Sequence, residues 1–233
     1  MSERRVAMIT GATGGLGRVL VPDLAAEGWD LVLVGSSRER LEGLVADLGL
    51  DAAHTATVEA NLRQRQAAVA TIDAAYERFG RVDALAHLVG GWTGGMHVGR
   101  SPDDPYQDML DQHFWTSLNV LRELAPRMTD AGFGRIAAVS SPMAGTPDAG
   151  MSAYGVGKAA QETLFAALAQ EVAGTGVTVN VVRVRAIDTS AGESGSDKAY
   201  ATTPAEISAA IRYLFSERAR VVNGERLGLH SGV

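Results

Sequence analysis

The feature that most constrains the fold of this chain is a regular alternation of short apolar runs with longer segments of helical period. Strands that are buried on both faces of a parallel sheet read as continuous apolar runs, and amphipathic helices supply the crossovers between them. Such an alternation is typical of βαβ units around one parallel sheet. The sequence therefore predicts an α/β fold with a doubly wound parallel sheet and right-handed crossovers.

We expect about seven strands and six helices in a single domain over residues 1–233, because this length suits one large α/β domain. The expected strands are 6–10, 31–35, 52–58, 84–89, 135–140, 177–184 and 226–229. The expected helices lie near 16–28, 38–49, 63–79, 103–130, 152–174 and 204–217. Residues 190–198 are small and polar, so we expect this stretch to stay mobile until a ligand binds.

Composition and charge exclude several kinds of function. The formal net charge is −6 and the isoelectric point is about 5.4, which argues against a nucleic acid partner. The absence of cysteine excludes disulfides, a thiol nucleophile and cysteine metal sites, and we expect no metal. No apolar stretch is long enough for a membrane span, and the run after Arg4 and Arg5 is too short for an export signal. We therefore expect a cytoplasmic protein that acts on a small molecule.

A glycine-rich loop joins the first expected strand to the first expected helix and reads Thr-Gly-Ala-Thr-Gly-Gly-Leu-Gly over residues 10–17. Its glycines let the chain turn tightly, approach a pyrophosphate closely and pack the helix on the strand, while the helix N-terminus offers free N–H groups. A plain strand-to-helix turn is the alternative. Because its position fits, the loop predicts a dinucleotide-binding Rossmann fold. The expected cofactor contacts are Gly11, Thr13, Gly14, Gly15, Leu16 and Gly17.

The residues after the second expected strand bear on which dinucleotide binds. Enzymes that prefer NAD place an acidic residue here to hold the ribose hydroxyls. This chain has Ser36, Ser37 and Arg38 instead. Two hydroxyls and a guanidinium suit a 2′-phosphate, so we predict NADP as the cofactor, with NAD possible. The competing interpretation is that the serines only cap the following helix.

Tyr154 and Lys158 lie four residues apart in Tyr-Gly-Val-Gly-Lys, and Ser141 precedes Tyr154 by thirteen residues. Only two of the 21 basic residues are lysines, so a composition that otherwise uses arginine has kept a lysine at 158. Positions four apart share a helix face, and a nearby ammonium lowers the pKa of a phenol from its usual value of about 10. The pair predicts that Tyr154 acts as a general acid and base.

With these motifs, the chain resembles the short-chain dehydrogenase/reductase family over essentially its full length. The resemblance implies hydride transfer between a nicotinamide and a carbonyl or alcohol substrate. Tyr154 would exchange the proton, Ser141 would bind the reacting oxygen, and Lys158 would lower the pKa of Tyr154 and bind the nicotinamide ribose. It further implies a homodimer or homotetramer built through the long helices near 103–130 and 152–174. The remaining implied cofactor contacts are Asn61, Leu62, Gly90, Ile187 and Thr189.

Several positions depart from the family pattern. His87 to Gly90 reads His-Leu-Val-Gly where the family has Asn-Asn-Ala-Gly, and Val184-Arg185 stands in place of Pro-Gly. His113 occupies the position of a helix Asn that often orders a proton-relay water, so it serves that relay or only fills space. Arg185 contacts substrate or turns to solvent. These departures leave open a dinucleotide-binding regulatory protein that has lost catalysis.

A narrower resemblance covers the loop at residues 90–95, Gly-Gly-Trp-Thr-Gly-Gly, together with the short lid expected at residues 190–203. Both features resemble dihydropteridine reductases, which implies a pterin reductase as an alternative function. Trp92 would then stack on a flat ring, although it could equally pack as an anchor within the loop.

Overall fold

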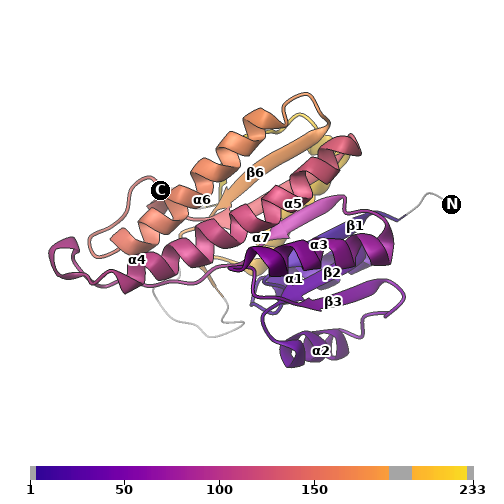
Figure 1. Cartoon of the computed structure of the whole chain (residues 1–233), viewed down its shortest axis with the longest axis horizontal. Coiled ribbons are helices and arrows are strands. Elements are labelled where there is room, and N and C mark those ends of the chain that lie inside the picture. The colour runs from indigo at the N-terminus through magenta and orange to yellow at the C-terminus, as the bar shows by residue number, and fades with distance from the viewer. Residues whose placement is uncertain (1–3, 189–200, 230–233) are drawn as a thin grey trace.

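The computed structural model describes residues 4–188 and 201–229, and a seven-stranded parallel sheet lies at its centre (Figure 1). The strand order is β3-β2-β1-β4-β5-β6-β9. The strands are β1 (Val6–Thr10), β2 (Asp30–Gly35), β3 (Thr55–Glu59), β4 (Ala84–His87), β5 (Gly134–Ser140), β6 (Val177–Arg183) and β9 (Arg226–Gly228). This arrangement confirms the expected doubly wound sheet.

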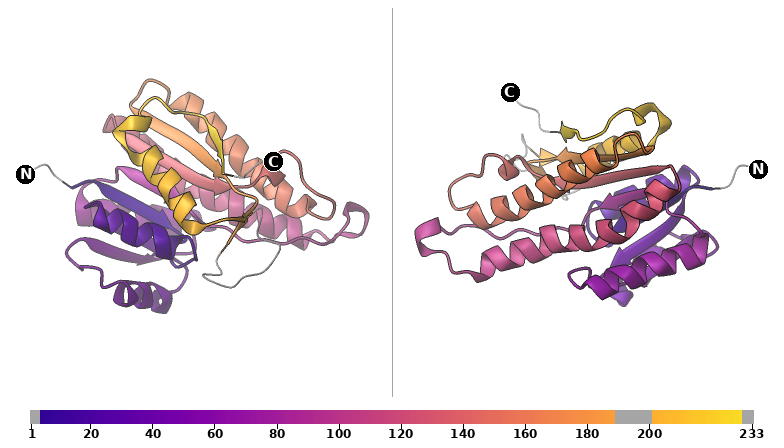
Figure 2. Two further views of the ribbon diagram at one scale, coloured as in Figure 1. Left: turned by 180° about the vertical axis from the view of Figure 1, so that it is seen from behind. Right: turned by 45° about the horizontal axis from the view of Figure 1, so that its top comes forward.

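Helices cover both faces of the sheet. They are α1 (Gly17–Ala26), α2 (Arg38–Asp47), α3 (Arg65–Phe79), α4 (Asp104–Met109), α5 (Thr116–Asp130), α6 (Ser152–Glu171) and α7 (Pro204–Phe215). Figure 1 shows α3, α5 and α6 over one face, and the view from behind in Figure 2 shows α1 and α7 over the other. Each face has its own apolar core because strand side chains alternate between the two faces.

Alternation along β1 illustrates how the two cores form. Met8 packs with Ile72 of α3 and Phe165 of α6, whereas its neighbour Ile9 packs with Leu20 of α1 on the opposite face. All five side chains are at most 1% exposed. The continuous apolar run that predicted this strand is therefore explained by burial on both faces.

The strand order reverses beside β1, where the sheet creates the place for a ligand. The chain runs outward from β1 through β2 to β3 and then returns to place β4 on the other side of β1. Helices leave the carboxyl ends of these strands in opposite directions, so a crevice opens between them. The glycine loop after β1 lies at this crevice.

Two features differ from the sequence-based expectation. The helix expected at 103–130 consists of α4, a π-helical segment at Leu110–Trp115 and α5, so its hydrogen-bond register shifts in the middle. Thr116 and Ser117 donate their hydroxyls to the carbonyls of Gln112 and His113, at 2.6 Å each, and such back-bonding competes with a regular helix. A small second sheet, β7 (Ala186–Ile187) with β8 (Ala201–Thr202), was not predicted.

Candidate active site

The glycine loop is shaped for close approach of backbone atoms. Gly11 has φ of +73°, and a Cβ there would lie 3.0 Å from main-chain atoms of Leu88 and Val89. A Cβ on Gly17 would lie 2.1 Å from the carbonyl oxygen of Ala12, so only glycine fits where α1 begins. The loop therefore keeps its backbone bare at the carboxyl end of β1 and the N-terminus of α1, which suits a pyrophosphate.

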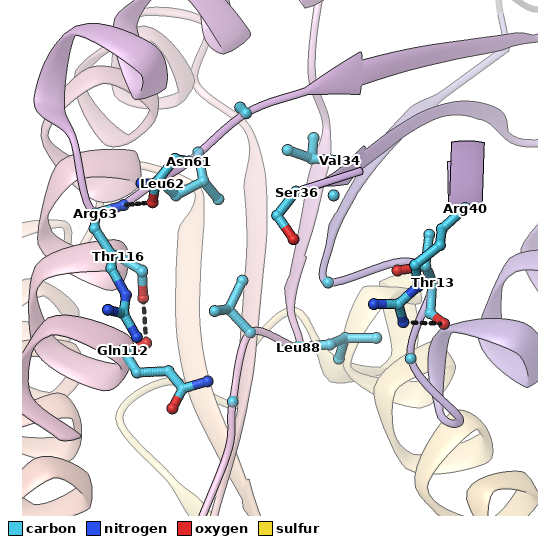
Figure 3. A pocket seen from close by; sticks show the side chains of 16 residues that line it. Thr13, Val34, Ser36, Arg40, Asn61, Leu62, Arg63, Leu88, Gln112 and Thr116 are labelled. Carbon is cyan, nitrogen blue, oxygen red and sulfur yellow. Dashed lines mark hydrogen bonds between the residues drawn. The ribbon is translucent and has the colours of Figure 1, made fainter. Parts of the chain in front are cut away.

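A cavity of about 610 Å³ opens on one side of this loop (Figure 3). Its walls come from the ends of β1, β2, β3 and β4 and from the π-helical segment. Ser36 points into the space, and Asn61 and Leu62 form the wall contributed by the segment after β3. Thr13, Gly14, Gly11 and Gly90 also line it. The expected adenine-side residues are thus brought together, with the exception of Ser37 and Arg38.

Arg40, and not Arg38, reaches this cavity. The Arg38 side chain is 73% exposed and pairs with Glu59, with 3.5 Å between Nε and Oε2, and Ser37 caps α2 by accepting from the Arg40 N–H. Arg40 instead donates from Nη2 to the Thr13 carbonyl at 3.3 Å, along the rim of the cavity. Sequence reasoning missed Arg40. The two-residue spacing could have indicated it, because Arg38 and Arg40 point to different sides of the first helical turn.

A second cavity of about 510 Å³ continues from the first on the other side of the loop. The two share Gly11, Gly14, Leu88, Val89 and Gly90. Tyr154 and Lys158 of α6 line the second cavity together with His113 and Trp92. Its other lining residues include Gly15, Leu16, Gly17, Arg185 and Ile187. A molecule bound across the glycine loop would thus extend from Ser36 to Tyr154. Thr189 and most of the expected lid lie outside the described residues.

Two glycines in the Tyr-Gly-Val-Gly-Lys motif let the start of α6 pack closely on its surroundings. A Cβ on Gly155 would lie 2.9 Å from Pro147 Cβ and 3.0 Å from the Met143 carbonyl oxygen. A Cβ on Gly157 would lie 2.7 Å from the Met109 carbonyl oxygen at the end of α4. These contacts fix the helix turn that carries Tyr154 and Lys158.

The electrostatics of Tyr154 differ from the expectation. Burial raises the pKa of its phenol, and a hydrogen bond with the Ser141 hydroxyl opposes that rise. Burial dominates, so the net shift is opposite to the lowering expected from Lys158, whose ammonium donates to the Val139 carbonyl at 2.9 Å and to Gln161 Oε1 at 3.0 Å. Ser141 is 1% exposed and its Oγ also accepts from the Met143 N–H. Tyr154 is therefore a protonated phenol beside a buried hydroxyl.

Lys158 is itself strongly perturbed. Burial lowers its pKa to about 7, and the carboxylate of Glu162 on the next turn partly opposes this shift. Glu162 is held by the guanidinium groups of Arg183 and Arg226. A lysine with a pKa near neutrality that lines a cavity is typical of reaction centres, which makes this end of the crevice the candidate active site.

Two buried histidines stand beside this centre. His87 accepts or donates at both ring nitrogens, with 2.8 Å from Nδ1 to Thr10 Oγ1 and 3.4 Å from Nε2 to Thr116 Oγ1. His113 donates from Nε2 to the Gly91 carbonyl at 3.1 Å, and its Nδ1 has no hydrogen-bond partner. Burial, followed by the charge of Lys158, lowers the pKa of each imidazole to about 3. Both are neutral near pH 7.

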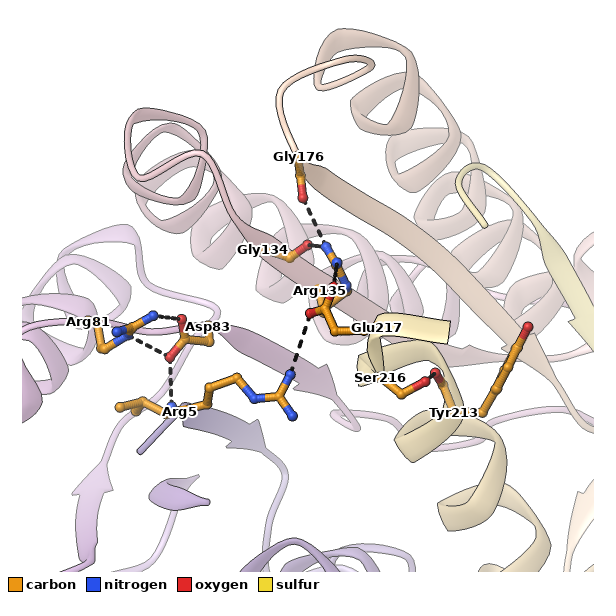
Figure 4. A network of polar contacts seen from close by, with 10 residues as sticks. Arg5, Arg81, Asp83, Gly134, Arg135, Gly176, Tyr213, Ser216 and Glu217 are labelled. Carbon is orange, nitrogen blue, oxygen red and sulfur yellow. Dashed lines mark hydrogen bonds and ion pairs between the residues drawn. The ribbon is translucent and has the colours of Figure 1, made fainter. Parts of the chain in front are cut away.

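A separate polar cluster lies at the opposite, amino-terminal ends of the strands (Figure 4). The Asp83 carboxylate accepts from the Val6 N–H at 2.8 Å and pairs with Arg81 at 2.6 Å. The buried Arg135 guanidinium donates to the carbonyls of Gly134 and Gly176 and lies 3.7 Å from Glu217. These contacts tie β1, β4, β5 and β6 together away from the cavities, so we assign them to stability.

Residues 5–199 match the family model described as short chain dehydrogenase. The chain is 28% identical to the acetoacetyl-CoA reductase of Acinetobacter sp. (strain RA3849) over 246 residues, which cover 100% of this chain and 99% of that relative.

Two solved structures have the same fold. The NAD+-bound xylitol dehydrogenase superimposes with a TM-score of 0.84 at 21% identity, covering 100% of both chains. ElxO with NADP bound superimposes with a TM-score of 0.89 at 17% identity, covering 97% of both chains.

Proposed function

This chain belongs to the short-chain dehydrogenase family and is an oxidoreductase that uses a nicotinamide dinucleotide, and we propose that it reduces a carbonyl substrate with NADPH, using Tyr154 as the proton donor. The observation that carries this proposal is that Tyr154 and Lys158 line one cavity with the glycine loop. When bound, the nicotinamide supplies the hydride.

Side chains in and beside the second cavity suit proton donation, hydrogen bonding to the reacting oxygen and binding of the cofactor ribose. Tyr154 keeps its proton at neutral pH because burial raises its pKa, so it can donate to an oxygen that gains negative charge. The Ser141 hydroxyl beside it can donate a hydrogen bond to the same oxygen. The Lys158 ammonium faces the cavity and can bind a ribose hydroxyl. Reduction of a carbonyl is the direction that a protonated phenol favours.

NADPH is the proposed cofactor because the first cavity offers Ser36 and Arg40 where a 2′-phosphate would lie, and Arg38 neutralises the nearby Glu59. The test measures the dissociation constants of NADPH and NADH by fluorescence. Arg40→Gln should weaken NADPH binding by about tenfold and leave NADH binding unchanged. Arg18→Gln is the matched control, because Arg18 pairs with Asp47 and lines neither cavity, and it should change neither affinity strongly. Equal affinities of the unmodified protein for both cofactors would contradict the proposal.

The substrate class separates two candidate functions. The likeness to an acetoacetyl-CoA reductase supports a 3-oxoacyl or similar ketone substrate. The indole of Trp92, 63% exposed and lining the second cavity, favours a planar substrate such as a quinonoid dihydropterin. Assay of ketones, 3-oxoacyl thioesters, quinones and quinonoid dihydropterin with both cofactors distinguishes these activities. Absence of turnover with every class, despite cofactor binding, would favour the regulatory protein instead.

We further propose a cytoplasmic homodimer or homotetramer. An apolar groove between α5 and α6, lined by Leu121, Ala125, Leu164 and Leu168, faces outward and suits a second copy of the same helix pair. Light scattering tests this assembly, and Leu168→Glu should shift the protein towards the monomer. Within residues 4–188 and 201–229, no helix combines the length and apolar content needed to cross a bilayer.

A further inference from the structure

Lys158 is held by a chain of hydrogen bonds that passes through two side chains outside the proposed chemistry. Its ammonium donates to the Val139 carbonyl at 2.9 Å and to Gln161 Oε1 at 3.0 Å. Nε2 of Gln161 donates to Ser117 Oγ at 3.0 Å, and the Ser117 hydroxyl donates to the His113 carbonyl at 2.6 Å. The chain thus connects α6 through α5 to the π-helical segment.

This chain is buried along its whole length. Gln161 and Ser117 are 0% exposed, and Lys158 is 4% exposed. A carboxamide placed there would cost free energy if its polar ends lacked partners. Both ends of Gln161 are instead used, the oxygen by Lys158 and the nitrogen by Ser117. A buried network whose groups are paired in this way holds its members in one arrangement.

The geometry determines the direction of the remaining N–H donor of Lys158. An ammonium group has three N–H donors in a tetrahedral arrangement. Val139 and Gln161 take two of them, which fixes the direction of the third, and Lys158 also lines the second cavity. We propose that Gln161 and Ser117 are positioning residues that fix the Lys158 ammonium so that its third N–H is presented to the cavity. The inference rests on the proposed role of Lys158 in the reaction.

The surroundings of Lys158 make Gln161 important for its charge as well. The titratable groups near it are His87 on β4, His113 on the π-helical segment, and Tyr154 and Glu162 on α6. The histidines are neutral near pH 7 and Tyr154 is protonated, while Glu162 is engaged by two arginines. Gln161 Oε1 is therefore a direct dipolar partner of the ammonium, and its removal should favour the uncharged amine.

The chain contains only two lysines, which makes a direct measurement possible. Protein labelled with 13C at lysine Cε, carrying Lys198→Arg to leave one signal, reports the titration of Lys158 by NMR. Gln161→Leu should lower the Lys158 pKa by about 0.5–1 unit through loss of one hydrogen bond to the charged form. Gln161→Glu should raise it, because a carboxylate takes the place of the amide. Ser117→Ala should lower it by a smaller amount, because Gln161 loses its anchor.

Gln170→Leu is the matched control, since Gln170 lies on the same helix and is exposed. It should leave the titration unchanged. The proposal would be overturned if Gln161→Leu left the Lys158 pKa unchanged. It would also be overturned if Gln161→Leu and Gln161→Glu shifted the Lys158 pKa in the same direction. If circular dichroism shows that Gln161→Leu is unfolded, the smaller shift in Ser117→Ala decides.

The titration requires neither cofactor nor substrate, so its result is independent of whether the proposed reductase activity is correct. In the enzymatic assay, the alkaline limb of the pH profile should move with the Lys158 pKa in each variant. A shifted Lys158 pKa in the variants, without turnover by the unmodified protein, would retain the positioning network and reject the proposed function. Turnover without any shift of the Lys158 pKa in the variants would retain the proposed function and reject the positioning network.

Discussion

The imidazole of His113 stands edge-on against the phenol of Tyr154, with ring centroids 5.6 Å apart and an angle of 81° between the ring planes. The same imidazole donates to the Gly91 carbonyl, so one side chain supports both the proposed proton donor and the loop that carries Trp92. The π-helical register at Leu110–Trp115 carries His113 at this point. His113 therefore connects the shape of the cavity to the position of Tyr154.

We expect His113→Leu to raise the Michaelis constant of the carbonyl substrate by about threefold to tenfold, because the loop at Gly91 loses a hydrogen bond. Leucine retains bulk against Tyr154 but cannot donate. Steady-state kinetics measure the change. His97→Leu, at an exposed position, is the control and should behave as the unmodified protein. An unchanged Michaelis constant in His113→Leu would mean that the loop does not depend on this bond.

The pH dependence should follow Lys158 rather than the histidines. The pKa of His113 is about 3, so its charge is constant between pH 5 and 9. The pKa of Lys158 is lowered to about 7, so its ammonium is present below pH 7 and is lost as the pH rises through 7. We expect kcat/KM for the cofactor, which reports the free protein, to fall above about pH 7. This fall in kcat/KM above pH 7 should remain in His113→Leu. If the fall disappears in that variant, it results from the histidine rather than from Lys158.

The two central residues of the proposed mechanism have separate expected phenotypes. Tyr154→Phe should leave NADPH binding near that of the unmodified protein and reduce turnover by at least about 10²-fold, as expected for the loss of a general acid. Lys158→Arg should also lose activity, because a guanidinium fork cannot occupy the buried place between Val139 and Gln161. Binding titrations and single-turnover rates separate the two effects. Full activity of Tyr154→Phe would remove this phenol from the reaction.

The close packing of α6 on α4 predicts a contrast between two glycines. Gly157→Ala should destabilise the protein by about 1–3 kcal/mol, because the new Cβ would lie 2.7 Å from the Met109 carbonyl oxygen. Gly43→Ala in the middle of α2 meets no atom within 4 Å and should stabilise by about 0.5–1 kcal/mol. Urea denaturation measures both. Equal effects of the two substitutions would contradict the packing of the Tyr154 turn.

Local patterns predicted the fold well because each part of it has a local cause. The apolar run of β1, the glycines that follow and the amphipathic start of α1 are adjacent in sequence, so their spacing alone indicates their contacts. The spacing of Tyr154 and Lys158 likewise requires only a helix. By contrast, β7 and β8 have only two residues each, which is too short for a detectable periodicity. Their pairing brings Ala186 beside Ala201 and Ile187 beside Thr202, and these partners are not close in sequence.

The remaining differences depend on three-dimensional placement. The spacing of Arg38 and Arg40 indicates that they point to different sides of the first turn of α2, but only the orientation of α2 determines that Arg40 lies at the cavity and that Arg38 pairs with Glu59. The π-helical segment keeps the apolar pattern of a helix, so the pattern does not show its altered hydrogen bonds. The raised pKa of Tyr154 results from burial, which outweighs the influence expected of a lysine that is bonded elsewhere.

The exposed indole of Trp92 provides a test of the substrate class. Its side chain is 63% exposed and lines the cavity that contains Tyr154, so it can stack on a flat ring bound there. Stacking contributes about 0.5–1.5 kcal/mol beyond area burial, and Trp92→Ala should therefore raise the Michaelis constant of a planar substrate by about threefold to tenfold, with a smaller change in turnover.

Trp115, which is 40% exposed and is not among the residues that line the two cavities, supplies the control, and Trp115→Ala should leave both kinetic constants unchanged. If Trp92→Ala leaves the Michaelis constants of planar substrates unaltered, or if a linear 3-oxoacyl thioester proves the best substrate, the stacking role and the pterin reductase alternative are both wrong. The proposed carbonyl reduction by Ser141, Tyr154 and Lys158 would stand in either case, because those residues act on the reacting oxygen and the cofactor rather than on the remainder of the substrate.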